Sequence, residues 1–467
     1  MSEAPRALRV AVIGAGPAGI YAADILTKSE EVRTGAVPVA IDIFDRYPAP
    51  FGLIRYGVAP DHPRIKGIIK ALHKVLDRGD IRFFGNVNYG TDLTLADLRK
   101  HYDAVIFATG AIKDASLNIP GIDLDGSYGA SDFVSWYDGH PDYPRTWPLK
   151  AKEIAVLGNG NVALDVARVL SKHAEDLLVT EIPDNVYQGL AASPVTDVHV
   201  FGRRGPAQIK FTPLELRELA HSRDVDIVLY EEDFQFDEAS LEAMETNAQT
   251  KVMMKTLKGW LEEQKENPGT ASRRLHLHFL QAPAEILGED GKVAGIRMER
   301  TQLNGQGGVT GTGEFLDYPV QAVYRAIGYF GSELPEVSFD AQRGVVTNLE
   351  GRVLDQDQQP VPGLYATGWI KRGPVGLIGS TKSDALETVT HLLEDRDSLY
   401  TAETADPAAI EAFLEGKGIR FTSWEGWLRL DEHEQALGAQ AKDAAGEPRA
   451  RVKVVDREEM TRISRGE

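Results

Sequence analysis

The chain has 467 residues, with 51 lysines and arginines against 70 aspartates and glutamates, which gives a net charge of −19. This length accommodates two or three domains with sizeable cores, and the acidic balance argues against nonspecific binding to nucleic acid. There are no cysteines, which excludes disulfides, a cysteine-ligated zinc or iron–sulfur centre and a dithiol relay. With no signal segment and no apolar run of roughly 20 residues, the sequence predicts no membrane span and a cytoplasmic location.

The first expected element is a buried strand at residues 10–13, followed by the glycine turn GAGPAG and a helix. Apolar residues on successive positions are typical of a parallel strand that is covered on both faces. Gly14 allows a tight turn, Gly16 lets a pyrophosphate approach the backbone, and Gly19 lets the helix pack closely. A lone G-x-G-x-x-G is a weak signal, but its strand and helix context predicts a dinucleotide site with phosphates at the helix N-terminus.

A second strand is expected at residues 39–44, with Asp45 at its carboxyl end. In this architecture an acidic residue after the second strand accepts hydrogen bonds from a ribose diol, although such a residue is often only solvated. The gap from Gly14 exceeds the usual spacing of about 20 residues, so the connection carries an insertion. We predict that Asp45 binds the ribose.

The next stretch is rich in Pro and Gly, a composition that more often shapes a site than merely connects elements. Its His62, between two prolines, is by itself better interpreted as a turn residue than as a catalytic one. The elements expected after it are a helix at 65–76, strands at 81–84 and 102–110, and a crossover and linker at 111–150.

A second nucleotide fingerprint begins with an expected strand at 153–157 and the turn GNGNVA, again followed by a helix. The strand at 195–201 then ends in Gly-Arg-Arg-Gly. Where an NAD site carries a carboxylate for the 2′-hydroxyl, this sequence has the guanidiniums of Arg203 and Arg204. Paired arginines match a 2′-phosphate in charge and in bidentate geometry. The pattern favours NADP over NAD, against the alternative of a solvated surface pair.

Thr212 is a plausible N-cap for a helix that carries Glu215 and Glu218 about one turn apart. Residues 275–318 alternate in polarity, which predicts antiparallel strands and hairpins, and 320–328 closes the second unit. The remaining elements expected are a strand at 362–369 ending Ala-Thr-Gly-Trp, a helix at 384–393, and a helical, charged tail at 400–467 anchored by Trp424 and Trp427.

Two nucleotide fingerprints in one chain have an obvious common use, which is hydride transfer between a nicotinamide and a flavin. The copy with Asp45 suits FAD, and the copy with Arg203 and Arg204 suits NADPH. The strand and glycine segment near the C-terminus would complete the first site.

The motifs RVAVIGAGPAGIYAA, PFGLIRYGVAPDHPRIK, FFGNV, GNGNVALDVARVL, GRRGPAQIKFTPLELREL and ATGWIKRGPVGLIGSTKSDA closely resemble the adrenodoxin reductase-like NADPH:ferredoxin reductases. The resemblance covers nearly the whole chain, and GVAPDHP and GWIKRGPVGLIG are specific to that family. It implies an α/β fold of glutathione reductase-like architecture with two Rossmann-like dinucleotide-binding domains. The FAD domain (1–110 and 365–467) would be split around an inserted NADP domain (111–364).

The resemblance also implies site residues. Those matched to FAD are Gly14, Gly16, Pro17, Ala18, Gly19, Asp45, Leu53, Val87, Trp369, Gly376, Leu377 and Ile378. Those matched to NADP are Asn159, Gly160, Asn161, Val162, Arg203, Arg204, Glu215 and Gly376. His62 and Glu218 match a pair at the flavin end of the nicotinamide pocket, which raises His62 above its interpretation as a turn residue. The departure is Asp45, where relatives commonly have Glu, and the shorter arm still reaches a ribose.

The resemblance therefore implies a ferredoxin–NADP reductase that passes hydride from NADPH to FAD and single electrons to a ferredoxin or flavodoxin, in either direction. No metal is expected on the chain. Basic residues expected to dock an acidic ferredoxin are Lys210, Arg217, Arg223, Arg273 and Arg274. One alternative is an electron-feeding subunit like the small chain of glutamate synthase, against which the lack of cysteine argues. Another is a flavin-bound NADP(H) redox sensor. No surface pattern indicates an oligomeric interface, so the oligomeric state is left open.

Overall fold

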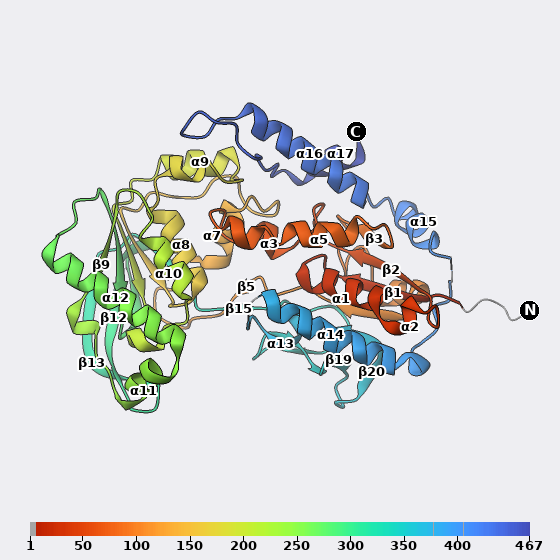
Figure 1. Cartoon of the computed structure of the whole chain (residues 1–467), viewed down its shortest axis with the longest axis horizontal. Coiled ribbons are helices and arrows are strands. Elements are labelled where there is room, and N and C mark those ends of the chain that lie inside the picture. Colours follow the sequence, from red (N-terminus) through yellow and green to blue (C-terminus); the bar gives the residue numbers. More distant parts are fainter. Residues whose placement is uncertain (1–5, 377, 405) are drawn as a thin grey trace, which may run out of the picture.

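The structure, a computed structural model, describes residues 6–376, 378–404 and 406–467. Two mainly parallel sheets divide these residues into two units that lie side by side along the longest axis (Figure 1). A smaller antiparallel sheet belongs to the second unit. Among the described residues, no helix combines the length and apolar character that crossing a membrane requires.

The first unit is built on a seven-stranded sheet, in which the strand that leads to the first glycine turn is apolar on both faces. In spatial order its strands are β18 (Asn348–Leu349), β19 (Arg352–Leu354), β20 (Pro360–Ala366), β4 (Ala104–Phe107), β1 (Leu8–Ile13), β2 (Val39–Phe44) and β3 (Ile81–Phe84). The five strands from β20 to β3 run parallel, and β18 and β19 are antiparallel. Val10 and Val12 pack into one core and Ala11 and Ile13 into the other, as expected for a doubly covered strand.

Helices α1 (Pro17–Lys28), α5 (Ile69–Leu76) and α14 (Ile378–Glu394) cover one face of this sheet. The chain order reverses between β4 and β1, which is the edge at which open α/β sheets bind ligands. The strands expected at 10–13, 39–44 and 81–84 are confirmed. The helix expected at 65–76 is broken, because α4 (Pro63–Lys66) ends before Gly67 and α5 begins at Ile69.

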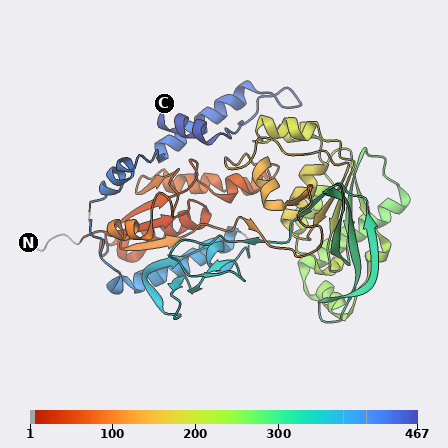
Figure 2. The same ribbon diagram turned by 180° about the vertical axis from the view of Figure 1, so that it is seen from behind.

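The second unit is built on a six-stranded parallel sheet. Its order is β6 (Ser127–Gly129), β14 (Ala322–Arg325), β7 (Glu153–Leu157), β8 (Asp197–Phe201), β10 (Arg273–His278) and β9 (Val225–Leu229). Helices α7 (Ala130–Tyr137), α8 (Asn161–Ser171), α10 (Pro213–Leu219) and α12 (Ala248–Glu266) share a core with one face. The other face shares a core with the sheet of β11 (Gln281–Glu289), β12 (Lys292–Leu303) and β13 (Val309–Tyr318), which Figure 2 shows from behind.

The prediction of antiparallel strands throughout 275–318 is wrong at its start. Strand β10 runs parallel between β8 and β9, and only β11, β12 and β13 form antiparallel hairpins. Residues 275–278, Leu-His-Leu-His, are all buried. Their alternation therefore separates two covered faces rather than a core face from a solvent face.

The remaining elements are mostly short. They are α2 (Glu30–Arg33), α3 (Leu53–Tyr56), α6 (Leu95–His101), β5 (Lys113–Asp114), α9 (Asp184–Ala191), α11 (Glu238–Thr246), β15 (Tyr329–Phe330), β16 (Phe339–Asp340), β17 (Val345–Val346), α13 (Trp369–Arg372), α15 (Ala409–Gly416), α16 (Trp424–Gln440) and α17 (Arg457–Arg465). Helices α16 and α17 lie along the first unit (Figure 1). Trp424 and Trp427 are buried there against Phe51, as the anchoring prediction requires.

The domain boundaries stay a prediction. Strands β18 and β19 join the seven-stranded sheet although they precede residue 365, where the sequence places the return to the first unit. We propose that this return lies before Asn348, because β18 already pairs within that sheet.

Candidate functional site

The first glycine turn connects β1 to α1 and leaves the N-terminus of that helix open. A side-chain carbon at Gly14 would collide with the Ala108 carbonyl oxygen, and one at Gly19 with the Gly14 carbonyl oxygen. Gly14 also has a φ of 116°, so glycine is required there for conformation as well as for space. A carbon at Gly16 would meet nothing nearer than Gly52 Cα, at 3.9 Å. No side chain caps α1, so this turn presents open backbone to an anion.

Asp45 follows β2 beside this turn and is buried. Its Oδ2 accepts a hydrogen bond from the Ala15 N–H at 2.7 Å, and its Oδ1 accepts one from the Tyr47 N–H at 2.9 Å. Burial raises the pKa of Asp45 to about 6, and the two backbone hydrogen bonds oppose that rise. Val87 is tied to the same place, because its N–H donates to the Asp45 carbonyl at 2.9 Å. Carboxylate oxygens keep further lone pairs for a hydroxyl, and the ribose contact stays a prediction.

The turn after β20 lies directly on the first glycine turn. A side-chain carbon at Gly368 would come within 2.6 Å of Ala18 Cβ, so the two turns touch. Asp384 of α14 holds the turn at Gly368 in place, because its carboxylate accepts hydrogen bonds from the Gly368 N–H at 2.5 Å and from the Thr367 hydroxyl at 3.1 Å. Trp369 then begins α13 and is partly exposed. Segments more than 300 residues apart in the sequence thus form one side of the site.

Other residues predicted to bind FAD lie around these turns. Pro17 is the first residue of α1. Leu53 begins α3 directly after Gly52, whose backbone approaches the first turn. Gly376 is exposed and has a φ of 86°. Leu377 lies outside the described residues, and Ile378 is the first residue of α14.

The second glycine turn repeats the first in the other sheet. A side-chain carbon at Gly158 would collide with the Ala326 carbonyl oxygen, and its φ is 140°. A carbon at Gly160 would meet no atom within 4 Å, and no side chain caps α8. The helix N-terminus is therefore open here as well, at the edge between β14 and β7 where the strand order reverses.

The residues of the second glycine turn are hydrogen-bonded to the segment before α10. The Asn159 carbonyl accepts from the Lys210 N–H at 3.0 Å, and Asn161 Oδ1 accepts from the Thr212 N–H at 3.0 Å. Val162 is the second residue of α8 and is half-buried. The predicted NADP contacts at 159–162 are thus placed together, and their role stays a prediction.

The two arginines after β8 are unpaired cations. Arg203 is exposed and Arg204 is half-buried, and within the described residues neither guanidinium makes a hydrogen bond or an ion pair. Glu215 is different, because its buried carboxylate accepts the Thr212 hydroxyl at the N-terminus of α10. Thr212 also accepts from the Glu215 N–H, which confirms the predicted N-cap. Contact of these residues with a nucleotide stays a prediction.

His62 lies where the two units meet, and the structure brings it to Glu218. Its Nε2 is 2.7 Å from Asp165 Oδ1 on α8, and its Nδ1 is 2.8 Å from Glu218 Oε2 on α10. The first contact is a hydrogen bond, whereas the second pairs charges without hydrogen-bond alignment. His62 is buried and Glu218 is partly exposed. Burial lowers the pKa of His62, but Asp165 outweighs this effect, so the net shift is upward.

The residue before His62 strengthens the same junction. Both oxygens of Asp61 accept from Arg168 of α8 at 2.8 Å, and Asp61 Oδ2 also receives Lys172 at 2.6 Å. Arg168 further donates to Asp165 at 2.8 Å. These cations hold the pKa of Asp61 well below its usual range, against the effect of burial. The 51–66 loop of the first unit is thereby fixed to α8 of the second.

Sequence reasoning missed the residues that support His62. Asp165 and Arg168 form a charged i, i+3 pair inside the apolar helix LDVARVL, and Asp61 adjoins His62 in PDHPRIK. A charged pair on a helix face that is otherwise buried is the signal that could have identified them.

One group among the described residues has the composition of a metal site, namely His199, His276 and His278. His199 Nδ1 lies 3.0 Å from His278 Nε2, and His276 contacts Asp197 through Nε2 at 2.9 Å and the Tyr230 hydroxyl through Nδ1 at 2.8 Å. The three rings are within 21° of parallel, and His199 Nδ1 and His278 Nε2 are already engaged with each other. Both nitrogens of His276 are engaged, and we assign no metal here.

Comparisons with known proteins agree with this geometry. A family model described as pyridine nucleotide-disulphide oxidoreductase matches residues 8–198, and one described as FAD binding domain matches residues 317–378. The chain is 39% identical to NADPH-ferredoxin reductase FprA of Mycobacterium tuberculosis, with 98% of this chain and 99% of that protein covered. It is 38% identical to the mitochondrial NADPH:adrenodoxin oxidoreductase of Arabidopsis thaliana, with 94% and 92% covered.

A solved structure, Mycobacterium tuberculosis FprA in complex with NADPH, superposes with a TM-score of 0.87 at 37% identity. It covers 99% of this chain, and all of that chain is matched. The α/β fold with two dinucleotide-binding units, expected from the sequence, is therefore confirmed over essentially the whole length.

Proposed function

The chain belongs to the family of NADPH-dependent ferredoxin and adrenodoxin reductases, and we propose that it carries electrons from NADPH through a bound FAD to a ferredoxin-type iron–sulfur protein. Bound FAD supplies the conversion between the two-electron oxidation of NADPH and single-electron transfer. The observation that carries the proposal is the pair of open glycine turns, one in each sheet, on either side of the junction at His62.

The residues around the first turn fit FAD. The backbone at Gly16 is unobstructed, α1 is uncapped, and the turn at Gly368 closes against Ala18. Asp45 is anchored by two backbone N–H groups, so its carboxylate is already oriented for a ribose hydroxyl. A site that is built before its ligand arrives loses little entropy on binding, which suits a resident cofactor.

The residues around the second turn fit NADP(H). The backbone at Gly160 is open, and α8 offers an uncapped N-terminus to the pyrophosphate. Arg203 and Arg204 have no protein partner among the described residues, so a 2′-phosphate would meet two free guanidiniums. NADH offers them only a hydroxyl, and the preference for NADPH follows from this difference.

His62 and Glu218 hold the two units together at the junction. Hydride transfer needs no protein acid or base, so these residues act by orientation and charge. The His62 ring faces Asp165 and Glu218, and Asp165 raises its pKa, whereas Arg168, whose Nη2 is 2.8 Å from His62 Nε2, opposes that rise. The ring thereby contacts both α8 and α10 at the junction.

The electron partner is a ferredoxin or, as the alternative, a flavodoxin. The relatives are named for ferredoxin and adrenodoxin, and this chain is itself acidic, so an acidic partner needs a local basic surface. Lys210 is exposed before α10, and Arg217 is exposed on α10, where its Nε donates to the Pro213 carbonyl at 3.1 Å. Arg223 and Arg274 are paired with acidic residues, and Arg273 is half-buried and donates to backbone carbonyls. Lys210 and Arg217 are exposed and have no acidic partner among the described residues, so they are the better docking candidates of the five.

The visible spectrum of the purified protein tests the proposal. The protein is expected to be yellow and to bleach anaerobically with NADPH at concentrations far below those needed for NADH. A colourless protein, or a yellow one that neither nucleotide reduces, would contradict a reductase. A flavin that binds but resists NADPH would instead favour a redox sensor.

A further inference from the structure

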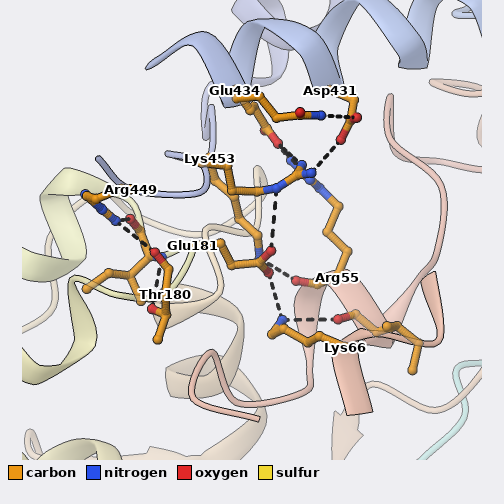
Figure 3. Close-up of polar contacts among 12 residues, drawn as sticks. Arg55, Lys66, Thr180, Glu181, Asp431, Glu434, Arg449 and Lys453 are labelled. Atoms are coloured by element: carbon orange, nitrogen blue, oxygen red, sulfur yellow. Dashed lines mark hydrogen bonds and ion pairs between the residues drawn. The ribbon is translucent and has the colours of Figure 1, made fainter. Parts of the chain in front are cut away.

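Between α16 and α17 the chain runs without helix across both units. We call residues 449–456 the C-terminal strap and residues 51–66, which include α3 and α4, the junction loop. Figure 1 shows the tail reaching from α16 toward α9 of the second unit, and Figure 3 shows the polar contacts that the strap makes. This segment takes no part in either glycine turn, so nucleotide binding does not explain its contacts.

Lys453, at the centre of the strap, is buried. Its ammonium donates to the Arg55 carbonyl at 2.6 Å and to the Asp138 carbonyl at 3.0 Å, and it pairs with Glu181 Oε1 at 2.8 Å. Arg55 belongs to the junction loop, Asp138 follows α7, and Glu181 precedes α9. One ammonium thus joins the strap to the first unit and to two segments of the second.

Lys66 completes the cluster from the junction loop itself. Its ammonium donates to the Ile54 carbonyl at 3.1 Å and pairs with Glu181 Oε1 at 2.9 Å and with Asp138 Oδ1 at 3.4 Å. Glu181 therefore lies between two ammoniums, as Figure 3 shows. Lys453, Lys66 and Asp138 are buried and Glu181 is half-buried, so water and salt do not readily replace a lost contact.

The rest of the strap is fastened on both sides of this cluster. Arg449 donates to the Ile182 carbonyl at 2.5 Å, which ties one end to the second unit. Glu434 of α16 accepts from the Val454 N–H at 3.0 Å and forms two contacts with Arg55, at 2.5 and 3.0 Å. The strap and the junction loop are thereby held by the same buried carboxylate.

Between Arg55 and Lys66 the junction loop carries His62, which contacts Asp165 and Glu218 of the second unit. The loop is thus held at His62 by α8 and α10, and at Arg55 and Lys66 by the strap and Glu181. We propose that Lys453 is a positioning residue, which holds the junction loop so that the two nucleotide-binding units meet in the arrangement needed for electron transfer between them. This inference rests on the proposed function.

The charge balance supports the proposal. Burial lowers the pKa of Lys453 to about 8, with Glu181 opposing the shift, so the ammonium persists at neutral pH. Burial also raises the pKa of Asp138 to about 6, against the pull of Lys66 and Lys453. Removing the ammonium alone would leave Asp138 and Glu181 with Lys66 and, 4.0 Å from Glu181 Oε2, with Arg451, whereas removing Glu181 as well restores the net charge of the cluster.

The test compares Lys453→Met, the double variant Lys453→Met/Glu181→Gln, and Arg9→Met as a matched control. Arg9 is an equally buried cation, paired with Asp42 in the first sheet, and Asp42 keeps Arg82 as a partner. Each purified, FAD-loaded protein is examined by hydrogen–deuterium exchange, by thermal unfolding, by the rate of flavin reduction by NADPH, and by binding of 2′,5′-ADP.

We expect at least about tenfold faster exchange in residues 51–66 and about tenfold slower flavin reduction in both Lys453 variants, with 2′,5′-ADP affinity unchanged within about twofold. The double variant is expected to recover thermal stability but not the rate. Arg9→Met should lose stability and keep both the loop exchange and the rate per folded molecule.

A double variant that recovers the wild-type rate together with its stability would overturn the positioning role. Charge balance alone would then explain the loss of both stability and rate in Lys453→Met. Unchanged exchange in the junction loop would overturn it independently of activity. Failure of the wild-type flavin to accept electrons from NADPH would instead contradict the proposed function, and the exchange measurement would still decide whether the strap holds the loop.

Discussion

The two glycine turns have the same strand–turn–helix frame and opposite surroundings. At the first, Asp45 is buried and both its oxygens are hydrogen-bonded to the backbone, and the turn at Gly368 packs against it. At the second, Arg203 and Arg204 extend from the end of β8 without protein partners among the described residues. One site is completed by the protein itself, and the other exposes unpaired charge.

This difference matches two kinds of ligand. Groups that are buried and oriented in advance favour long residence, because binding orders little that is new. Free surface guanidiniums attract an anion quickly and remain solvated without it. The first turn therefore suits a cofactor that stays, and the second suits a nucleotide that arrives and leaves in each cycle.

The largest expected effect comes from removing the unpaired charge. Arg203→Ser/Arg204→Ser should weaken NADPH binding by about 100- to 10,000-fold, because each arginine supplies a charge-assisted hydrogen bond to a phosphate that contributes roughly 1.5–3 kcal/mol. NADH binding should change little, so the preference between the two nucleotides should nearly vanish. Titration of the flavin spectrum with each nucleotide measures both affinities.

Arg223→Ser is the matched control, because this exposed arginine of the same unit is already paired with Asp176. It should leave the NADPH affinity within about twofold. Equal loss of NADPH and NADH binding in the double variant would show that the pair stabilises the turn rather than recognising a 2′-phosphate.

A smaller effect is expected at the first turn. Asp45→Asn keeps the shape but turns one acceptor into a donor, which would face the Ala15 or the Tyr47 N–H. One buried N–H then loses its partner, at a cost of about 1–3 kcal/mol in the free energy of unfolding. The midpoint of urea unfolding, followed by tryptophan fluorescence, measures this loss.

Glu215→Gln at the second turn provides the comparison. The glutamine oxygen still accepts the Thr212 hydroxyl, so the expected loss is below about 1 kcal/mol. If the two variants lose equal stability, the first turn is no more completely built than the second.

Much of the fold could be predicted from sequence because its signals are local. The strand–glycine–helix pattern placed β1, β2 and β7 within a residue or two, and Thr212 was recognisable as an N-cap. The positions of both turns and of the arginine pair in the fold were predictable to the same extent, since they follow strands directly, and their contacts with nucleotides stay predictions. The contact of His62 with Glu218 required the family resemblance, because no local pattern joins residues 156 positions apart.

The errors have two physical causes. The alternation in Leu-His-Leu-His predicted an antiparallel strand, but both its leucines and its imidazoles are buried, and β10 lies inside the parallel sheet. The tail was expected to be helical, yet the strap is extended because Lys453 and Arg449 find their partners far away in the sequence. A charged segment gives no local sign that its charges will be buried against another unit.

The smallest expected effect is a difference in how the stability of the two units changes with pH. Burial lowers the pKa of His199 to about 3 and also lowers those of His278 and, against the effect of Asp197, of His276, so protonation of these rings is disfavoured in the folded second unit. On acidification they bind protons more readily after unfolding, so they lower the stability of the second unit as pH falls below about 6.5, and Asp138 of the same unit, with its pKa raised to about 6, offsets part of that loss. Asp45 acts in the opposite direction, because its raised pKa lets the folded first unit take up a proton first, near pH 6.

Hydrogen–deuterium exchange, corrected for intrinsic rates, should therefore show the second unit opening before the first as the pH is lowered from 7 to 5.5. His199→Asn removes one of these groups, and the fall in unfolding free energy over that range should become about 1 kcal/mol smaller. His221→Asn, at an exposed histidine of the same unit, should leave the fall unchanged because that ring is in water before and after unfolding. A first unit that opens earlier in acid would show that the buried histidines do not set the order, and the contrast between the two regions would then lie only in their nucleotide sites.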